Sequence, residues 1–382
     1  MTTSSSVAFV RSETLQPSPA PSSVRGPVAW IRENMLSSPT NIILTLIGLY
    51  LIYITVPEMV RFYFIDAVWT GKDRDACLPE KVGRPVGACW AYVADRVQYF
   101  TYGSYPIAER WRINITFVLF ALGVVWLLWD KLPQKKVAGV YFFLIMPVIG
   151  FFLLRGSPMF GLVKVDTGLW GGMTVSLLIA AVGIVFSLPL GILLALGRRS
   201  RLPIIRVLSV VFIEFVRGVP LITVLFMANT MLPLFVPQEY SPDRLLRPLI
   251  GVALFAAAYM AEVIRGGLQA MPKGQYEGAQ SLGLGYGKMM RLIILPQALR
   301  IVIPGIVNTF IGLFKDTTLV AIVGIFDFLR TIEATLVDPT WATPTTRATG
   351  YAFAAIFYFL CCWGMSRYSI SVEKRLAAGQ KR

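Results

Sequence analysis

The 382-residue sequence contains no histidine. This absence excludes histidine general bases, histidine metal ligands and Ser-His-Asp triads together. Only four cysteines are present, and their spacing fits no zinc site. Charged residues make up 15% of the chain, against roughly 25% in a soluble domain. With no cluster of cysteines or carboxylates either, the sequence argues against a membrane enzyme with a side-chain catalytic centre.

Hydrophobic residues, by contrast, make up 55% of the chain, and the mean hydropathy is +0.64. They form continuous runs near or above about eighteen residues, long enough for a helix to cross roughly 30 Å of hydrocarbon. Barrel strands would alternate in segments of about ten residues. We therefore expect an all-α integral membrane protein with about eight transmembrane helices, near residues 41–60, 113–129, 137–154, 170–196, 207–236, 249–263, 301–323 and 348–365. The sequence Arg217-Gly218-Val219-Pro220 interrupts the fifth helix.

The net charge of +15 indicates orientation rather than nucleic-acid binding, because membrane proteins concentrate Lys and Arg in their cytoplasmic loops. With a cytoplasmic N-terminus, the short inner loops 130–136, 197–206 and 264–300 are all basic. The end of the chain is basic too, through Lys374, Arg375, Lys381 and Arg382. We therefore expect both termini in the cytoplasm.

Two polar regions precede the later helices. Residues 1–40 are rich in Ser, Thr and Pro and lack the order of a signal peptide, so we expect a disordered cytoplasmic tail. Residues 61–112 form a periplasmic insert that carries Cys77 and Cys89. A disulfide is allowed in that compartment, and two unpaired cysteines in a packed lobe are the alternative.

The stretch EGAQSLGLGYGKMMRLIILPQ, residues 277–297, is polar and glycine-rich although it lies between two apolar runs. Its GLGYGK segment is not a Walker A loop, because Leu282 replaces the first required glycine and Met289 follows Lys288 where Ser or Thr is needed. The dinucleotide pattern fails as well, since no glycine occupies position 288. We expect this chain to bind no cofactor directly.

The same stretch is typical of two short helices joined by a turn. Pro272 suits the first helical position, and Gly283 suits a left-handed helix end. Tyr276, Ala279 and Leu282 then share one face. Gly285 and Gly287 permit a reversal, and a second helix over 286–295 is expected to stop at Pro296. Such a unit could dock into a groove of another protein or be a plain helical linker.

This stretch resembles the EAA loop of the permeases of ATP-binding-cassette importers. That pattern is Glu-Ala-Ala, three residues, Gly, nine residues, Ile-x-Leu-Pro, and the chain has Glu277-Gly278-Ala279, Gly283 and Ile293-Ile294-Leu295-Pro296. Gly278 departs from the pattern and should loosen the helix by roughly 1 kcal/mol. The resemblance implies an ATPase-coupling loop over 277–296 that includes Glu277, Ala279, Leu282, Gly283, Gly285, Ile293, Leu295 and Pro296.

Four further segments resemble the polar amino-acid branch of these permeases: EFVRGVP (214–220), AYMAEVIRGGLQAMPKGQ (258–275), LPQALR (295–300) and KDTTL (315–319). The resemblance covers about 168–370, a five-helix permease core, followed by a basic cytoplasmic tail at 371–382. The preceding membrane extension, 41–167, has three extra spans and the GACWA segment (87–91), and is similar to the long permease subunit of general L-amino-acid importers.

The resemblance implies a division of labour among several proteins. A second permease subunit, a cytoplasmic ATPase dimer that uses ATP and Mg, and a periplasmic amino-acid-binding protein would act with this chain in the inner membrane of a bacterium. The chain itself would be non-catalytic. A self-contained secondary amino-acid transporter is the alternative, although the inverted halves common in that class are not visible here.

Ionisable residues within spans are functional candidates by default. Glu214 and Arg217, like Glu262 and Arg265, are three apart on one helix face near a cytoplasmic end, where a bracing ion pair is the simpler interpretation. Lys315 and Asp316 lie about 21 Å from the inner end of their helix, and Asn308 shares a face with Lys315. They could meet the two charges of an amino acid or brace another helix or subunit.

Overall fold

The computed structural model describes residues 26–129 and 131–380, so residues 1–25 of the expected tail and Lys381 and Arg382 lie outside the described residues. Regular structure in the described residues is helical, with isolated β-bridges but no strand. The chain divides into two compact units, one ending at Ala67 and the other starting at Val68.

The first unit contains helix α1 (Pro27–Asn34) and helix α2 (Pro39–Val60), which continues into a π-helical turn, η2 (Arg61–Ile65). The Ser38 side chain caps α2 by accepting a hydrogen bond from the Asn41 backbone N–H at 3.2 Å. The expectation of disorder across 1–40 is therefore wrong for residues 27–34. Pro27 supplies a helix start there, and the apolar residues of VAWIREN interrupt the Ser/Thr/Pro composition on which that expectation rested.

The second unit holds the remaining helices. Its N-terminal part contains η3 (Arg74–Cys77), α3 (Pro79–Val82), α4 (Trp90–Tyr102), η4 (Ile107–Glu109), α5 (Arg110–Leu128), α6 (Lys135–Val140), η5 (Tyr141–Ile145), α7 (Met146–Arg155), η6 (Pro158–Phe160) and η7 (Thr167–Leu169). The rest contains α8 (Gly172–Arg198), α9 (Pro203–Gly218), α10 (Leu221–Phe226), η8 (Met227–Met231), α11 (Leu232–Phe235), η9 (Gln238–Tyr240), α12 (Leu246–Ala270), α13 (Lys273–Ser281), α14 (Tyr286–Met289), η10 (Met290–Ile294), α15 (Leu295–Ile301), α16 (Ile303–Asp316), η11 (Thr317–Val323), α17 (Phe328–Thr335) and α18 (Thr346–Gln380).

Seven helices of the described residues are long and apolar enough to cross a membrane, and a bent pair, α9 with α10–α11, makes an eighth span if it counts as one. Their positions overlap every expected run, but three spans are longer than expected: the second starts at Ile107, the sixth ends at Ala270 and the last ends at Leu376. The fifth span is bent by 108°. The bend falls at Val219-Pro220, where Pro220 lacks a backbone N–H and holds an extended conformation before α10. The number and the helical class of the spans are thus confirmed.

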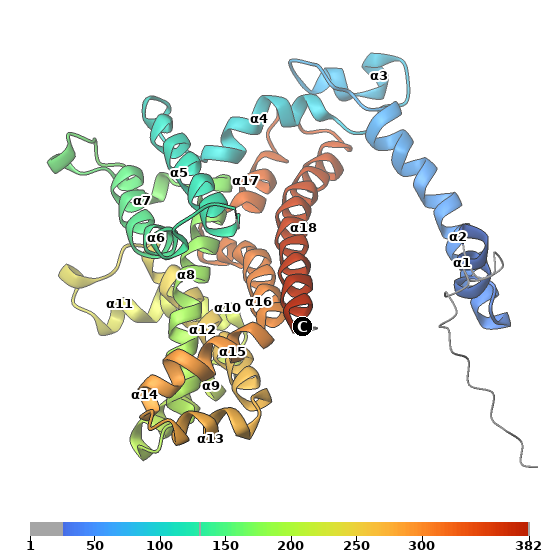
Figure 1. Ribbon diagram of the computed structural model, residues 1–382. Coiled ribbons are helices and arrows are strands. Elements are labelled where there is room, and N and C mark those ends of the chain that lie inside the picture. The colour runs from blue at the N-terminus through green and yellow to red at the C-terminus, as the bar shows by residue number, and fades with distance from the viewer. Residues whose placement is uncertain (1–25, 130, 381–382) are drawn as a thin grey trace, which may run out of the picture. The chain divides into compact units, whose positions relative to one another are not determined.

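The second unit has two opposite ends (Figure 1). One end, here the loop end, carries α13 and α14 together with the C-terminal ends of α8 and α12. The other, the lobe end, carries α4 and α17. Helices α8, α12 and α16 connect the two ends.

Helices α8 and α12 form the centre of this unit because small residues let them approach closely. A Cβ built on Gly191 of α8 would lie 2.7 Å from the Met260 side chain of α12. Ala256, Ala257 and Ala261 of α12 are buried along this helix. Small side chains are the usual means of close helix packing in membranes, so the α8–α12 pair gives the loop end a rigid support.

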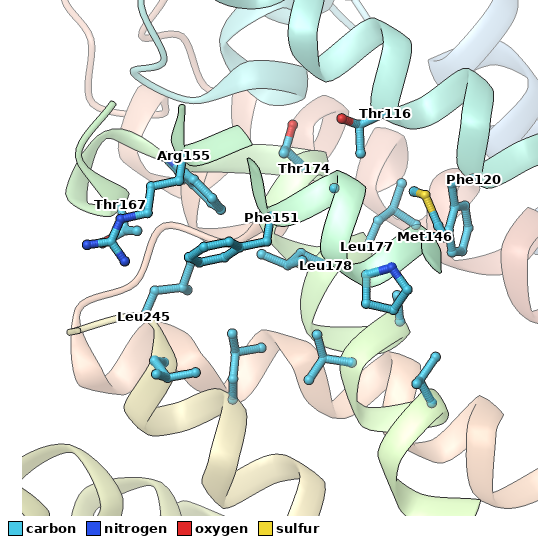
Figure 2. Close-up of a pocket in the computed structure, with 18 of the residues that line it drawn as sticks. Thr116, Phe120, Met146, Phe151, Arg155, Thr167, Thr174, Leu177, Leu178 and Leu245 are labelled. Carbon is cyan, nitrogen blue, oxygen red and sulfur yellow. The ribbon is translucent and has the colours of Figure 1, made fainter. Parts of the chain in front are cut away.

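Helices α5 and α7 pack together as a separate pair beside α8. Their attachment is made near the lobe end, where Ile113 and Leu154 pack with Trp170 and Val175. The buried Arg112 donates to the Val163 carbonyl at 2.7 Å and pairs with Glu109 at 2.6 Å. An apolar groove remains between this pair and helices α8 and α12 (Figure 2).

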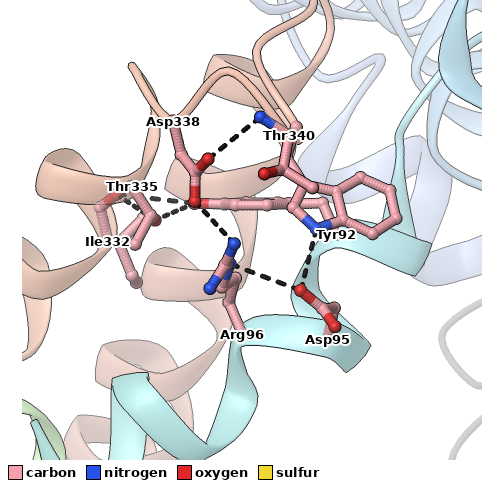
Figure 3. A network of polar contacts seen from close by, with 8 residues as sticks. Tyr92, Asp95, Arg96, Ile332, Thr335, Asp338 and Thr340 are labelled. Carbon is pink, nitrogen blue, oxygen red and sulfur yellow. Dashed lines mark hydrogen bonds and ion pairs between the residues drawn. The ribbon is translucent and has the colours of Figure 1, made fainter. Parts of the chain in front are cut away.

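The lobe end is built from the insert and the segment around α17, which are distant in sequence. Cys77 and Cys89 are joined by a disulfide, with their Cα atoms 5.8 Å apart. The buried Tyr92 hydroxyl lies 2.6 Å from the Thr335 hydroxyl, and Arg96 pairs with Asp338 at 2.6 Å (Figure 3). Residues 68–112 of the insert thus belong to a packed lobe and not to a flexible loop.

Candidate functional site

The segment between α12 and α16 folds as the helix–turn–helix that its spacing predicts. Helix α13 begins after Pro272, which serves as its N-cap and not as its first helical residue. Gly283, with φ +70°, ends it in the left-handed region. The N–H of Gly283 donates to Gln280 O at 2.9 Å and that of Leu284 to Ala279 O at 3.2 Å, the two bonds of a Schellman cap.

The two faces of α13 differ in burial. Ala279 is 2% exposed and packs with Tyr276 in the cluster that includes Ile264 and Met290. Leu282, expected on the same face, is 74% exposed because the cap turns the chain away. Glu277 is exposed as well. The loop therefore presents an acidic and an apolar side chain outward while Ala279 fixes it to the helices behind.

The second helix does not stop at Pro296, and that expectation is wrong. Helix α14 passes through the π-helical turn η10 into α15, which has Pro296 in its first turn. Proline has no backbone N–H to donate, and the wider π turn shifts the hydrogen-bond pattern so that this donor is not needed. The helical path therefore continues through Pro296. Ile293 and Leu295 are partly buried in the same cluster, whereas Pro296 is exposed.

The other loop glycines have weaker conformational roles than the sequence indicated. Gly285 is the N-cap of α14 with φ −64° and ψ 159°, a conformation open to any residue. A Cβ on Gly285 or Gly287 would meet no atom within 4 Å. Among the described loop residues, only Gly283 has the left-handed backbone that favours glycine.

Tyr276 ties α13 to the long helices. Its hydroxyl donates to the Leu268 carbonyl of α12 at 3.3 Å and accepts from Arg199, just after α8, at 3.2 Å. Arg199 also donates to the Leu268 carbonyl at 3.1 Å. Arg199 was not expected to take part, because the basic loop 197–206 that contains it indicated only orientation.

Five charged residues from α8, α9 and α12 gather near the loop end. Glu262 pairs with Arg265, as expected, but also lies 3.5 Å from Arg198 and 3.6 Å from Arg217. In the described part of the chain, Glu214 does not pair with Arg217 as expected; it pairs instead with Arg198 at 2.7 Å. Single-helix spacing could not reveal Arg198, the residue that links both carboxylates across helices.

The three candidate substrate-path residues lie on α16. Asn308 and Lys315 are exposed on that helix, and Asp316 is half-buried. Neither Lys315 nor Asp316 takes part in an ion pair among the described residues. Their charges are therefore not used to brace another described helix of this chain.

Seven or eight apolar helices long enough to span a membrane, with a compact loop exposed at one end, define the described chain as a multi-pass integral membrane protein. A family model described as "binding-protein-dependent transport system inner membrane component" matches residues 187–375. The inner membrane amino-acid ABC transporter permease protein YhdY of Escherichia coli (strain K12) is 48% identical over 364 residues, which cover 95% of this chain and 97% of that protein. The chain belongs to this family of multi-pass inner-membrane proteins.

A second curated relative and one solved structure are also similar to this chain. The glutamate/glutamine/aspartate/asparagine transport system permease protein BztC of Rhodobacter capsulatus is 41% identical over 433 residues, covering 97% of this chain and 99% of that protein. A crystal structure of an amino acid ABC transporter with histidines is 27% identical, covers 53% of this chain and 92% of that one, and has a TM-score of 0.47. The family match begins inside α8, and the near-full-length relatives extend the likeness over the N-terminal extension.

Proposed function

We propose that this chain is the permease subunit of an ATP-driven importer that moves L-amino acids from the periplasm to the cytoplasm by alternating access. The observation that carries the proposal is the exposed α13–α14 loop, which is held to α8 and α12 through Tyr276 and Arg199. The amino-acid substrate class is supported by the names of the two relatives that match nearly the whole chain, an amino-acid ABC transporter permease and a glutamate/glutamine/aspartate/asparagine transport system permease.

In this proposal the loop end and both termini are cytoplasmic, in keeping with the basic residues of the loops there. The loop docks on an ATPase, which binds and hydrolyses ATP with Mg; this chain is non-catalytic and holds no cofactor. Movement of α13 is passed to α8 through Arg199 and to α12 through the Leu268 carbonyl. The exposed Glu277 and Leu282 are the residues that we expect to contact the ATPase.

The remaining partners are a second permease subunit, which forms a heterodimer with this chain, and a periplasmic amino-acid-binding protein at the lobe end. Asn308, Lys315 and Asp316 then line the path between the two permeases, and the two charges receive the carboxylate and ammonium groups of the substrate. A self-contained secondary transporter would leave the exposed α13–α14 loop without a role.

The proposal is tested by expressing the chain with an ATPase, a second permease and a binding protein, and measuring ATP-dependent amino-acid uptake in proteoliposomes. Gly283→Ala should weaken ATPase co-purification and uptake, because alanine in the left-handed region costs about 1–2 kcal/mol. Gly287→Ala is the matched control, since a Cβ has free space at both glycines but only Gly283 has positive φ. Uptake that persists without ATP or ATPase, or equal effects of both variants, would contradict the proposal.

A further inference from the structure

The groove between the α5–α7 pair and helices α8 and α12 has a volume of about 280 Å³. Its walls are apolar over most of their length and include Phe120, Met146 and Leu178. The hydroxyls of Thr116 and Thr174 in its lining are already used, since they donate to the carbonyls of Arg112 and Thr101 at 2.8 Å each. An amino acid, which carries two charges, would lose its hydration in the apolar interior of this groove without gaining partners there.

The charged side chains of the groove, Arg155 and Asp243, lie at one end. Figure 2 shows Arg155 and Thr167 together there, with Phe120 and Met146 at the opposite end. Arg155 is the last residue of α7 and of its membrane span, so its guanidinium lies at the level where hydrocarbon gives way to polar headgroups. The groove therefore has a charged mouth and an apolar interior.

Arg155 makes no ion pair among the described residues, although it lies over the Phe151 ring at 5.7 Å. Asp243 also lines the mouth; one of its oxygens, Oδ1, accepts from the Thr167 hydroxyl at 2.5 Å and from the Leu245 N–H at 3.0 Å. The buried indole Nε1 of Trp170, which lines the same groove, has no acceptor in the described part of the chain. The mouth thus offers a cation and a carboxylate, and the groove lining also holds an unused donor.

The groove has the length of one bilayer leaflet. Its lining runs along α8 from Thr174 to Phe186, a rise of about 18 Å at 1.5 Å per residue. Half of a hydrocarbon core roughly 30 Å thick is about 15 Å. A chain that starts at the mouth and fills the groove would therefore end near the middle of the membrane.

We propose that this groove is a phospholipid-binding site: one acyl chain fills the apolar channel, Arg155 binds the phosphate and Asp243 binds the amine of an ethanolamine headgroup. A guanidinium suits phosphate because its donors match the phosphate oxygens in pairs. The lipid would hold the α5–α7 pair against α8 and α12 where protein contacts are missing. This role is separate from transport and does not depend on the proposed function.

The first experiment measures lipid retained by the full chain after purification in mild detergent, by native mass spectrometry with added phosphatidylethanolamine or phosphatidylglycerol. Arg155→Gln should lower retained phosphatidylethanolamine at least threefold, and Ala181→Phe should do the same by filling the groove. Matched controls are Lys164→Gln, an exposed cation outside the groove, and Leu193→Phe, an exposed residue of α8 outside it. Equal retention by the variants and their controls would overturn the proposal.

Two further experiments identify the molecule that fills the groove and the headgroup that it carries. A photoreactive amino acid at Phe151, which lines the groove and is 50% exposed, should cross-link to a phospholipid in native membranes. A cross-link to protein, either a partner or the segment 39–65 of this chain, would overturn the lipid assignment. Wild type should retain phosphatidylethanolamine over phosphatidylglycerol, and Asp243→Asn should abolish that preference; no preference in wild type would overturn the role of Asp243.

Discussion

The Arg199 guanidinium donates to the Tyr276 hydroxyl at 3.2 Å and lies 5.7 Å from the centre of its ring. Both residues share the Leu268 carbonyl of α12 as an acceptor. These contacts join α13 to the ends of two long helices at one point. A displacement of α13 is therefore transmitted to α8 and α12 together. Coupling to another protein requires a connection of this kind.

Tyr276→Phe tests this connection, because it removes the hydroxyl and its two hydrogen bonds but keeps the ring. The loss of about 1 kcal/mol should raise amide hydrogen exchange in α13 about fivefold and lower uptake per ATP hydrolysed in the reconstituted complex. Tyr286→Phe is the matched control, since Tyr286 is 58% exposed in the same loop. If the two variants exchange and transport alike, the Tyr276 hydroxyl has no part in coupling.

Glu262→Gln should destabilise the loop end more than Glu214→Gln. Glu262 is 22% exposed at its side chain and lies near three arginines, whereas Glu214 is 53% exposed and meets only Arg198. A partly buried carboxylate shared by three cations is worth more than a surface pair, which contributes about 0–1 kcal/mol. The free energy of unfolding, measured by thermal unfolding in detergent, should fall by more than about 1 kcal/mol for Glu262→Gln but not for Glu214→Gln. Equal losses would show that the cluster acts as independent surface pairs.

Asp316→Asn tests the proposed substrate path, since it removes the charge but keeps the shape. Transport should fall severalfold while the complex assembles normally, because the amide attracts a substrate ammonium less well than the carboxylate does. Asp316→Glu, which keeps the charge, should restore part of the activity. The measurement is uptake in proteoliposomes with co-purification as the assembly control; unchanged uptake for Asp316→Asn would remove this residue from the path.

Sequence reasoning succeeded where a feature depends on neighbours along the chain. The apolar runs located the spans, and the spacing from Pro272 to Gly283 gave both helix α13 and its left-handed end. It failed where the partner is remote. Arg198 is the last residue of α8, and its partners Glu214 and Glu262 lie on other helices. Arg199 follows α8, and its partner Tyr276 lies on α13. No spacing rule along the chain could connect these pairs.

The lobe end shows the same difference between features set by neighbouring residues and features set by remote ones. Two cysteines twelve residues apart made a disulfide conceivable, but the contacts that order the insert come from residues over two hundred positions later. Trp341 is buried there and donates through its indole N–H to Asp95 at 2.8 Å. The π turn before Pro296 was also missed, because a proline signals the end of a helix unless the backbone widens to admit it.

Asp327, at the lobe end and outside the spans, should make stability depend on pH. It is fully buried as the N-cap of α17, where it accepts from the N–H groups of Leu329 and Arg330 at 3.1 Å each. Burial raises the pKa of this carboxyl from 3.8 to about 6, although the two backbone donors partly offset the shift. As pH rises from about 4 to 6, the unfolded chain ionises first, so the folded state loses about 3 kcal/mol.

Asp327→Asn keeps an acceptor for the cap but cannot ionise. Between pH 4 and pH 7, the free energy of unfolding of this variant in detergent should therefore increase by about 3 kcal/mol relative to that of wild type. Asp338→Asn is a control of opposite sign, because hydrogen bonds from Thr340 hold the Asp338 pKa below its usual value. The free energy of unfolding of Asp338→Asn should fall relative to that of wild type as pH rises through the ordinary carboxyl range. The reason is that only wild type acquires the stabilised charge. A wild-type pH profile in Asp327→Asn would mean that the buried carboxyl does not titrate in this window.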